Sequence, residues 1–437
     1  MVSLGCAKNL VSSEQMLWLL SDMGCRIVPE PSGADAVVVN TCGFIESAKR
    51  EAIETILEMA ALKSAGKLGK ILVAGCLVER YRGEVRDELP EVDGLLGCGG
   101  FHEIRDVLFE ALQGKKPVRL GAPAEEPLDT PRLVTTPAHT AYLKVAEGCD
   151  NRCAYCVIPS LRGPFRSRPM AALIEEARQL AARGAKELIL VAQDTTRYGL
   201  DLYGERRLPA LLDELCRIES LRWLRLHYLY PDEIDDALIE RVAREEKIVK
   251  YLDIPLQHIS DKLLTAMNRR GTRRDVEALI ETLRARIPDL VLRTSLIVGL
   301  PGEGEAEFEE LCAFLRAVRM ERVGVFSYSA EEGTPAAEMP DQVPEEIKKR
   351  RAEVVTEIQT EIMDDFNATL QGRILTVLTE GYDRYAGCHI GRSWADSPDV
   401  DGKVYFTARS RVPEGEMVRV RVTGTLEGDL FGKARGV

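Results

Sequence analysis

The chain has 437 residues, of which 45% are hydrophobic and 29% are charged, and its formal net charge is −12. This is the composition of a globular protein with two to four domains, and the acidic balance argues against a mainly electrostatic nucleic-acid binder. No run approaches the roughly 18 apolar residues of a membrane span, and no signal-peptide pattern opens the chain, so we expect a cytoplasmic protein without membrane contact. The eleven cysteines are an odd number. In a reducing compartment, clustered cysteines are more often ligands or catalysts than disulfides.

The first 120 residues alternate short apolar runs with helical patterns. Ala36–Val39 and Ile71–Ala74 indicate buried strands, and Ser47–Leu62 indicates an amphipathic helix. Such alternation is typical of a parallel sheet with helices on its faces. We therefore expect an N-terminal α/β domain over residues 1–120. A Pro-rich, polar linker follows at 121–138.

The strand–helix rhythm resumes near Tyr142 and continues to about residue 330. Six strand–helix units predict a full or partial β/α barrel, and Pro344–Leu370 predicts a long charged helix behind it. We assign this central domain to residues 139–370. The candidate strands are Ala141–Ala146, Glu187–Val191, Trp223–His227, Tyr251–Ile254, Leu290–Leu296 and Gly324–Tyr328.

Residues 371–437 show β patterning with Gly turns and no helix signal. Ile374–Thr379, Lys403–Thr407 and Met417–Gly424 are candidate strands, which predict a small antiparallel barrel. Counting gives 10 basic and 9 acidic residues in this segment, so the barrel is nearly neutral. That balance is unlike a basic clamp for nucleic acid.

The strongest motif is a cysteine triplet. Cys149, Cys153 and Cys156 have the spacing C-x3-C-x2-C and directly follow a candidate strand. One loop can then present three thiolates to one cluster, and a cubane iron–sulfur cluster bound by three cysteines, not the usual four, keeps one iron open for a substrate. Structural zinc is the main alternative, but it prefers four protein ligands, and the sequence offers no fourth Cys or His close by. Three unliganded buried cysteines are the other alternative.

Three more cysteines follow short apolar runs in the N-terminal domain. Cys6, Cys42 and Cys76 each come shortly before a helical stretch. Because parallel strands end at one edge of a sheet, where ligands bind, these thiols can converge although they are 36 and 34 residues apart. A second three-thiolate cluster is therefore plausible, although small buried cysteines are common in α/β cores, and the residues alone favour that interpretation. We interpret the remaining cysteines, Cys25, Cys98, Cys216, Cys312 and Cys388, as structural.

Two further motifs lie at candidate strand ends of the central domain. The segment from Thr294 to Glu303 is Gly-rich, and glycines there let the backbone approach a ligand closely. Pro255–His258 and Arg269–Gly271 are polar segments that the residues alone favour as ordinary surface and core.

The cysteine loop, with Tyr155 before its third cysteine and a β/α barrel after it, resembles the radical S-adenosylmethionine superfamily. The resemblance implies that Cys149, Cys153 and Cys156 hold a 4Fe–4S cluster, whose reduction cleaves S-adenosylmethionine to a 5′-deoxyadenosyl radical. Radical chemistry of this kind belongs to the cofactor, while the protein orients and shields it. The resemblance also implies a set of cofactor-binding residues: Tyr155, Gln193, Arg293, Gly299, Pro301 and Gly302.

Over its whole length the chain resembles the methylthiotransferases, which carry an N-terminal cluster domain, a radical domain and a C-terminal TRAM barrel. The matching motifs are Gly5–Asn9, Asn40–Cys42, Gly75–Cys76 and Phe326–Ala336. The family implies that Cys6, Cys42 and Cys76 hold an auxiliary 4Fe–4S cluster, which reverses the interpretation favoured above. Members usually carry a few more residues before the first Gly-Cys, so we expect a short first strand here.

The family has two branches, which modify a transfer-RNA adenosine or the β-carbon of an aspartate in ribosomal protein S-twelve. Gln193–Gly199, Leu226–Pro231 and Ala395–Gly402 look like the protein-modifying branch. The resemblance implies S-adenosylmethionine as both radical source and methyl donor. It also implies an electron donor and a sulfur source as partners, and a barrel that docks the substrate protein. Trp394 is a candidate contact of that barrel, and a core role is an equal alternative. A transfer-RNA enzyme, a zinc-containing RNA-binding protein and a redox-sensing disulfide protein remain the alternatives.

Overall fold

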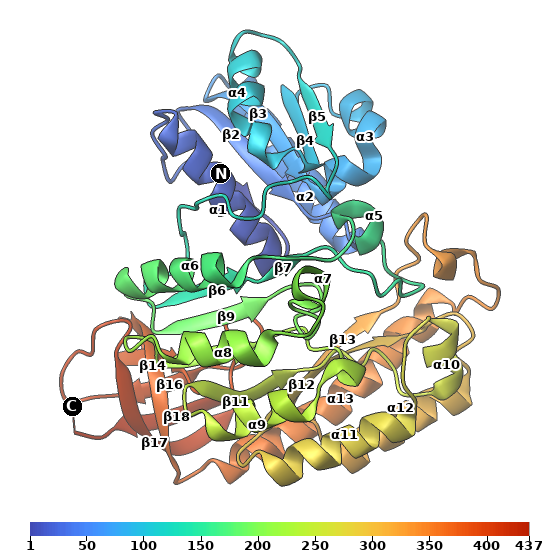
Figure 1. Ribbon diagram of the computed structural model, residues 1–437, viewed down its shortest axis with the longest axis vertical. Coiled ribbons are helices and arrows are strands. Elements are labelled where there is room, and N and C mark those ends of the chain that lie inside the picture. Colours follow the sequence, from blue (N-terminus) through green and yellow to red (C-terminus); the bar gives the residue numbers. More distant parts are fainter. Residues whose placement is uncertain (437) are drawn as a thin grey trace.

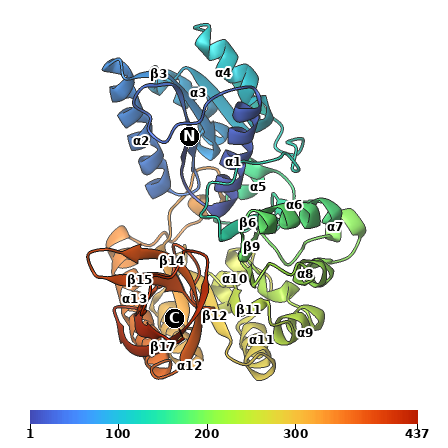
Figure 2. The same cartoon turned by 90° about the vertical axis from the view of Figure 1, so that its left-hand side faces the viewer.

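The computed structural model describes residues 1–436 as three units, an N-terminal parallel sheet, a central open β/α barrel and a C-terminal β-barrel (Figure 1). The N-terminal unit lies at one end of the long axis, and the small barrel lies beside the central sheet at the other end (Figures 1 and 2). Within the described residues, no helix is long and apolar enough to cross a membrane.

The N-terminal sheet is parallel throughout, with the strand order β1-β2-β3-β4-β5. The alternation expected from the sequence is confirmed, since Val38 faces a core under α1 and α4 while Val37 and Val39 face a core under α2. The first strand is short, as expected. The elements are β1 (Val2–Ser3), α1 (Ala7–Asp22), β2 (Ala34–Thr41), α2 (Glu46–Ser64), β3 (Leu68–Gly75), α3 (Cys76–Glu88), β4 (Gly94–Gly99), α4 (Ile104–Leu112) and β5 (Val118–Gly121).

No regular helix or strand lies between Gly121 and Thr140, where the linker was predicted. This segment is nevertheless held against α1. Gln15 donates to the Leu128 carbonyl at 3.2 Å, and the backbone of Leu133 donates to that of Glu14 at 3.0 Å. The linker therefore runs along the N-terminal unit before it enters the central sheet.

The central sheet has six parallel strands in the order β6-β9-β10-β11-β12-β13, and its two outer strands do not pair with each other. This is the partial form of the predicted barrel, covered outside by helices, with α13 packed on α12 and β13. The strands are β6 (Thr140–Lys144), β9 (Glu187–Val191), β10 (Trp223–Leu226), β11 (Ile248–Asp253), β12 (Val291–Val298) and β13 (Arg322–Ser327). The main helices are α6 (Met170–Ala182), α8 (Leu208–Cys216), α9 (Asp236–Arg244), α11 (Arg273–Arg286), α12 (Glu305–Val318) and α13 (Glu345–Thr369).

Shorter elements stand near the carboxyl ends of these strands. They are β7 (Ala146–Glu147), α5 (Ile158–Arg162), β8 (Arg166–Ser167), α7 (Leu200–Tyr203) and α10 (Asp261–Ala266). The pair β7–β8 is antiparallel, and it brackets the cysteine loop and α5.

The C-terminal unit is the predicted barrel, closed in the order β14-β15-β16-β18-β17. Four of its pairings are antiparallel, and the β16–β18 pairing is parallel. Its strands are β14 (Ile374–Asp383), β15 (Cys388–Arg392), β16 (Val404–Thr407), β17 (Met417–Leu426) and β18 (Asp429–Ala434).

The loop at residues 393–401, here called the anchoring loop, joins this barrel to the central sheet. Asp396 pairs with Arg322 at 2.9 Å, and Asp401 accepts a hydrogen bond from Tyr251 at 2.6 Å. Trp394 lies half-buried in this junction, and its indole nitrogen donates to a backbone carbonyl at 3.0 Å. Of the two roles open to Trp394, the structure therefore shows the core role, because its ring packs between the two units.

Candidate functional site

The C-x3-C-x2-C motif forms the loop between β7 and α5, at the carboxyl end of the first central strand. Backbone contacts fix it at both sides: the Cys149 amide donates to Gly163 at 3.1 Å, and the Ala154 amide donates to Met267 at 2.9 Å. Gly148 precedes the loop with φ +78°, and a Cβ there would come within 2.0 Å of the Pro164 carbonyl oxygen. Only glycine permits this entry into the loop.

The three thiols of this loop lie close enough to influence one another. Burial raises the pKa of Cys149 to about 11 and that of Cys156 to about 12, and the charge that Cys153 would carry raises both further. Each thiol therefore opposes ionisation of its neighbours unless a cation lies among them. Three such soft donors on one loop suit an iron–sulfur cluster, which binds thiolates and displaces their protons.

A cation and two phenol rings surround Cys153. Arg269 donates toward the Cys153 sulfur at 3.9 Å and toward the Tyr155 hydroxyl at 3.4 Å, and it stacks on the Tyr230 ring at 4.4 Å. Tyr155, predicted to lie near the cofactor, is buried, and its ring packs with Leu300 of the Gly-rich loop. The cysteine loop and the Gly-rich loop are thus neighbours at one edge of the sheet.

The three N-terminal cysteines also converge on one sheet edge, as their placement predicted. Cys6 immediately precedes α1, Cys42 directly follows β2, and Cys76 is the first residue of α3 after β3. Burial raises the pKa of Cys42 to about 11, and the charges that Cys76 and Cys6 would carry raise it further. The three thiols therefore form a second group that shares one electrostatic environment.

A glycine adjoins each of these three cysteines and lets the chain segments approach closely. A Cβ on Gly5, which has φ +84°, would lie 2.8 Å from the Cys42 Cβ and 3.3 Å from its sulfur. A Cβ on Gly43 would lie 2.9 Å from the Cys76 carbonyl carbon. Side chains at these positions would force the thiols apart, so the glycines belong to the site.

Among residues 1–436, no three His, Cys, Asp or Glu side chains are arranged around a single metal ion. A cubane cluster does not require that arrangement, because each of its thiolates binds a different iron. Zinc would need its ligand atoms at about 2.0–2.3 Å from one centre. The donor chemistry of both triplets, soft sulfur without imidazole or carboxylate, fits the cluster.

The carboxyl ends of the two sheets face each other across a charged junction. Lys8, two residues after Cys6, places its ammonium 3.3 Å from the centre of the Tyr228 ring beyond β10. Glu331 beyond β13 accepts an ion pair from Arg80 of α3 at 2.6 Å. These contacts hold the two cysteine triplets on opposed edges.

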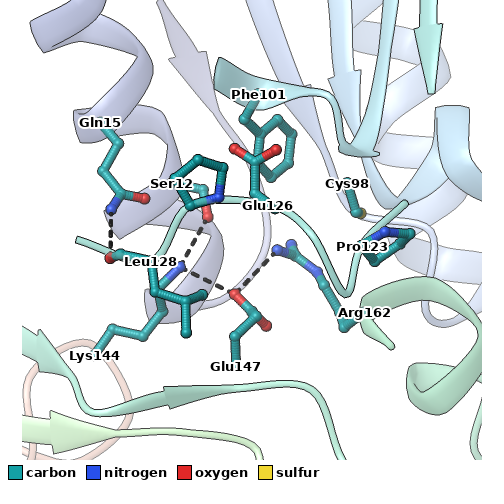
Figure 3. A pocket seen from close by; sticks show the side chains of 11 residues that line it. Ser12, Gln15, Cys98, Phe101, Pro123, Glu126, Leu128, Lys144, Glu147 and Arg162 are labelled. Carbon is teal, nitrogen blue, oxygen red and sulfur yellow. Dashed lines mark hydrogen bonds and ion pairs between the residues drawn. The ribbon is translucent and has the colours of Figure 1, made fainter. Parts of the chain in front are cut away.

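The centre of the junction is a buried cluster of ionised side chains, shown in Figure 3. Glu147 pairs with Lys144 at 3.0 Å and with Arg162 at 3.5 Å, and it accepts a hydrogen bond from Gln193 at 2.6 Å. Although burial acts in the opposite direction, the two cations hold the pKa of Glu147 at about 2. A cavity of about 10 Å³, room for about one water molecule, lies among these groups and Cys98.

Cys98, interpreted from the sequence as structural, is buried beside a predicted ligand. Its thiol donates toward the Cys76 sulfur at 3.9 Å, and Arg162 donates to the same sulfur at 3.4 Å. The hydrogen bond from Cys98 lowers the pKa of Cys76 to about 6, with help from Arg162 and against the effect of burial. Of the six predicted ligand thiols, Cys76 has the surroundings that most clearly favour a thiolate.

The other predicted cofactor residues lie at the same edge, and two of them, Arg293 and Gly299, also contact other side chains of the protein. Gln193 follows β9, and its Oε1 is buried without a hydrogen-bond partner among the described residues, as a ligand-facing atom would be. Arg293 pairs with Asp253 at 2.8 Å inside the open barrel. Gly299, with φ +78°, closely approaches Lys348 of α13. Pro301 and Gly302 continue this turn.

Sequence reasoning missed the cationic side chains that surround the thiols. Arg162 and Lys144 contact cysteines or their neighbours, but no motif included them. Arg269 contacts Cys153, and it lies in the segment Arg269–Gly271, which the residues alone favoured as ordinary surface and core. A usable signal was the position of Arg162, six residues after Cys156 on the same segment. His258, by contrast, is a core polar residue, as the residues alone favoured, and burial lowers its pKa to about 3.

Comparison with known proteins places each unit. The Radical SAM superfamily matches residues 143–315, the uncharacterized protein family UPF0004 matches residues 1–97, and the TRAM domain matches residues 372–434. Among solved structures, a radical S-adenosylmethionine methyltransferase, TsrM, from Kitasatospora setae has a TM-score of 0.55 at 13% identity, covering 85% of this chain and 75% of its own.

The open β/α sheet with its three-cysteine loop, a second cysteine-bearing sheet and a TRAM barrel define a radical S-adenosylmethionine enzyme. Curated relatives extend over the full length. "Ribosomal protein uS12 methylthiotransferase RimO" of Pelotomaculum thermopropionicum is 50% identical, covering 99% of this chain and 98% of its own. The protein of the same name from Caldanaerobacter subterraneus is 48% identical with the same coverage. The chain therefore belongs to the RimO family of ribosomal protein uS12 methylthiotransferases.

Proposed function

We propose that this protein adds a methylthio group to the β-carbon of an aspartate in ribosomal protein uS12, using radical S-adenosylmethionine chemistry. The observation that carries the proposal is the pair of cysteine triplets on opposed carboxyl edges of two parallel sheets, in a chain whose full-length relatives bear that name. We also propose that the three units are separate domains, with boundaries near residues 120, 139 and 370.

In this proposal each triplet holds one 4Fe–4S cluster. Cys149, Cys153 and Cys156 hold the cluster of the central domain, and Cys6, Cys42 and Cys76 hold the auxiliary one. Three thiolates leave one iron of a cubane without a protein ligand, which is the position that a substrate can take. The close-approach glycines described above support both assignments.

When bound, the clusters and S-adenosylmethionine supply electron transfer, hydrogen abstraction from an unactivated C–H bond, sulfur and a methyl group. The residues of this chain position these groups and exclude water from them. Arg269 and Tyr230 flank Cys153 and fix the entrance of the central site. Gln193, with its unpartnered Oε1, is placed to orient a polar group of the cofactor. The buried junction around Glu147 excludes bulk water between the two edges.

The assignment of the substrate rests on the family more than on any single side-chain contact in the structure. A net charge of −12 suits a basic protein partner, because opposite charges speed encounter. Transfer RNA is the substrate class to be tested against it, since its phosphates would be repelled. The proposal further requires an electron donor and a sulfur source as partners.

The direct test offers both substrates to the enzyme at once. Anaerobically reconstituted protein is incubated with S-adenosylmethionine, a reductant, sulfide, ribosomes and transfer RNA, and mass spectrometry follows the methylthio adduct. An adduct on uS12 alone is expected. An adduct on transfer RNA, with none on uS12, would overturn the substrate while leaving the cluster assignments in place.

A second test separates the roles of the two triplets. Cys149→Ala should abolish release of 5′-deoxyadenosine, whereas Cys42→Ala should retain it and lose only sulfur insertion. Cys388→Ala, in the distant barrel, serves as the matched control and should retain both. Equal loss of cleavage in Cys149→Ala and Cys42→Ala would contradict the division of labour.

A further inference from the structure

One guanidinium crosses from the central unit into the N-terminal unit. Arg162 is the last residue of α5, six residues after Cys156, and only 4% of it is exposed. Its Nη2 donates to Asn9 Oδ1 at 2.9 Å and to the Cys76 sulfur at 3.4 Å. A residue of the segment that carries one cysteine triplet therefore contacts a cysteine of the other.

The charge of Arg162 is only partly neutralised by carboxylates. Within residues 1–436 its one ion-pair partner is Glu147 at 3.5 Å, and Glu147 has a shorter contact with Lys144, at 3.0 Å. The guanidinium also lies over the Phe101 ring at 5.7 Å, which fixes its plane. The Asn9 amide oxygen and the Cys76 sulfur accept the hydrogen bonds of the guanidinium nitrogen that points into the N-terminal unit.

We propose that Arg162 is a positioning residue for the auxiliary cluster, donating a hydrogen bond across the domain junction to the Cys76 sulfur and raising the reduction potential of that cluster. The inference rests on the proposed function, because it takes Cys6, Cys42 and Cys76 as cluster ligands. Hydrogen bonds to ligand sulfurs and nearby positive charge stabilise the reduced form, which carries one more negative charge.

The arrangement links the two sites through the chain. Because Arg162 and Cys156 belong to one short segment, the loop that holds the first cluster also supports a ligand of the second. Arg162 then raises the reduction potential of the auxiliary cluster only when the central unit is docked on the N-terminal unit. Electron transfer to the auxiliary cluster is thereby favoured in the assembled enzyme.

The chain offers a matched control four residues further on. Arg166 is half-buried on the same segment, and it donates to the backbone carbonyls of Glu126 at 3.0 Å and Pro123 at 2.7 Å, with no cysteine among its partners. Arg166→Gln removes an equal charge near the junction without touching the Cys76 sulfur. Arg162→Gln removes the donor itself, and Arg162→Lys keeps a charge but shifts the donor geometry.

The experiment uses the full chain with Cys149, Cys153 and Cys156 replaced by Ala, so that iron is held at the N-terminal edge alone. Iron and sulfide are counted, and a redox titration followed by electron paramagnetic resonance gives the midpoint potential. Removing a hydrogen bond to a charged group changes an equilibrium by about tenfold. For a one-electron couple this is about 59 mV, in the direction of a lower potential.

We expect Arg162→Gln to lower the midpoint potential by about this amount and to change the resonance spectrum, whereas Arg166→Gln leaves both unchanged. A full iron content with the parent's potential in Arg162→Gln overturns the inference, and so does an equal shift in Arg166→Gln. If Arg162→Gln does not retain iron, Arg162→Lys is titrated; because it keeps the charge and alters only the hydrogen bond, a resonance spectrum and a potential that both equal the parent's overturn the hydrogen bond to Cys76. Absence of iron from the triple-alanine chain itself would instead refute the ligand assignment on which the inference rests.

Discussion

Removing the carboxylate of Glu187 should loosen the barrel from the central sheet. Glu187 is fully buried at the start of β9, and its two oxygens pair with Arg225 at 2.8 Å and with Arg392 of the barrel at 2.6 Å. Although burial opposes ionisation, the two arginines hold its pKa at about 2, against 4.5 for the free side chain. That difference corresponds to about 3 kcal/mol of stability at neutral pH. Breaking a buried pair by removing one partner has a cost of the same order, about 3–5 kcal/mol.

Two tryptophans provide the assay. Trp223 in β10 and Trp394 in the anchoring loop both lie in the hydrophobic cluster at this junction, so their fluorescence reports its unfolding. Glu187→Gln should lower the urea midpoint of that transition by about 1 M. Glu416→Gln, an exposed carboxylate of the barrel, should leave it unchanged.

The pH dependence gives the sharper test of the electrostatic origin. A carboxyl with a lowered pKa stabilises the fold fully above its unfolded value of about 4.5 and loses the contribution as pH falls toward 2. The difference between parent and Glu187→Gln should therefore be complete at pH 7 and shrink below pH 4.5. An unchanged midpoint at pH 7, or a difference that is undiminished at pH 3, would refute the reasoning.

Three further outcomes follow from the cysteine edges. Gly5→Ala should reduce the iron bound at the N-terminal edge by half or more, because the new Cβ would lie 2.8 Å from the Cβ of Cys42. Iron counting on the variant and the parent tests this prediction, and a full iron content in the variant would contradict it. Glu331→Gln, which removes the partner of Arg80, should increase hydrogen exchange in α3 by about tenfold, and unchanged protection would speak against this contact as a latch. Burial raises the pKa of Cys149 to about 11, and the thiol must lose its proton to bind iron, so the rate of cluster reconstitution should increase between pH 7 and pH 8.5. A reconstitution rate that does not change with pH would show that deprotonation does not limit iron binding.

The parts of the site that depend on local sequence were predictable. The Cys149 loop was recognisable from spacing within eight residues. The rule that parallel strands end at one edge indicated that Cys42 and Cys76 could converge, whereas their assignment as ligands came from the family resemblance. In the fold, β9 coincided with its prediction, and β4 was missed because its six residues include three glycines, which have poor β propensity.

The parts that depend on contacts between distant residues were not predictable. Arg162 and Cys76 are 86 residues apart, and no local sequence pattern around either residue predicts their contact. The sequence left the role of Trp394 open for the same reason, since its burial comes from another unit. The motif around Ala395 indicated the substrate branch, and its acidic side chains have a second role that the sequence did not reveal, since they anchor the barrel.

The ion pair between Arg392 of β15 and Glu187 has a consequence for how a protein substrate must be built. Swinging the barrel away from the central sheet would separate Arg392 from the fully buried Glu187 and leave that carboxylate short of a partner, so the two units move together. A protein held on the barrel would then meet a fixed span between its docking surface and the cysteine edges. Selection of the target aspartate becomes a measurement of length, in which an insertion or deletion between docking surface and target shifts modification to another residue or stops it.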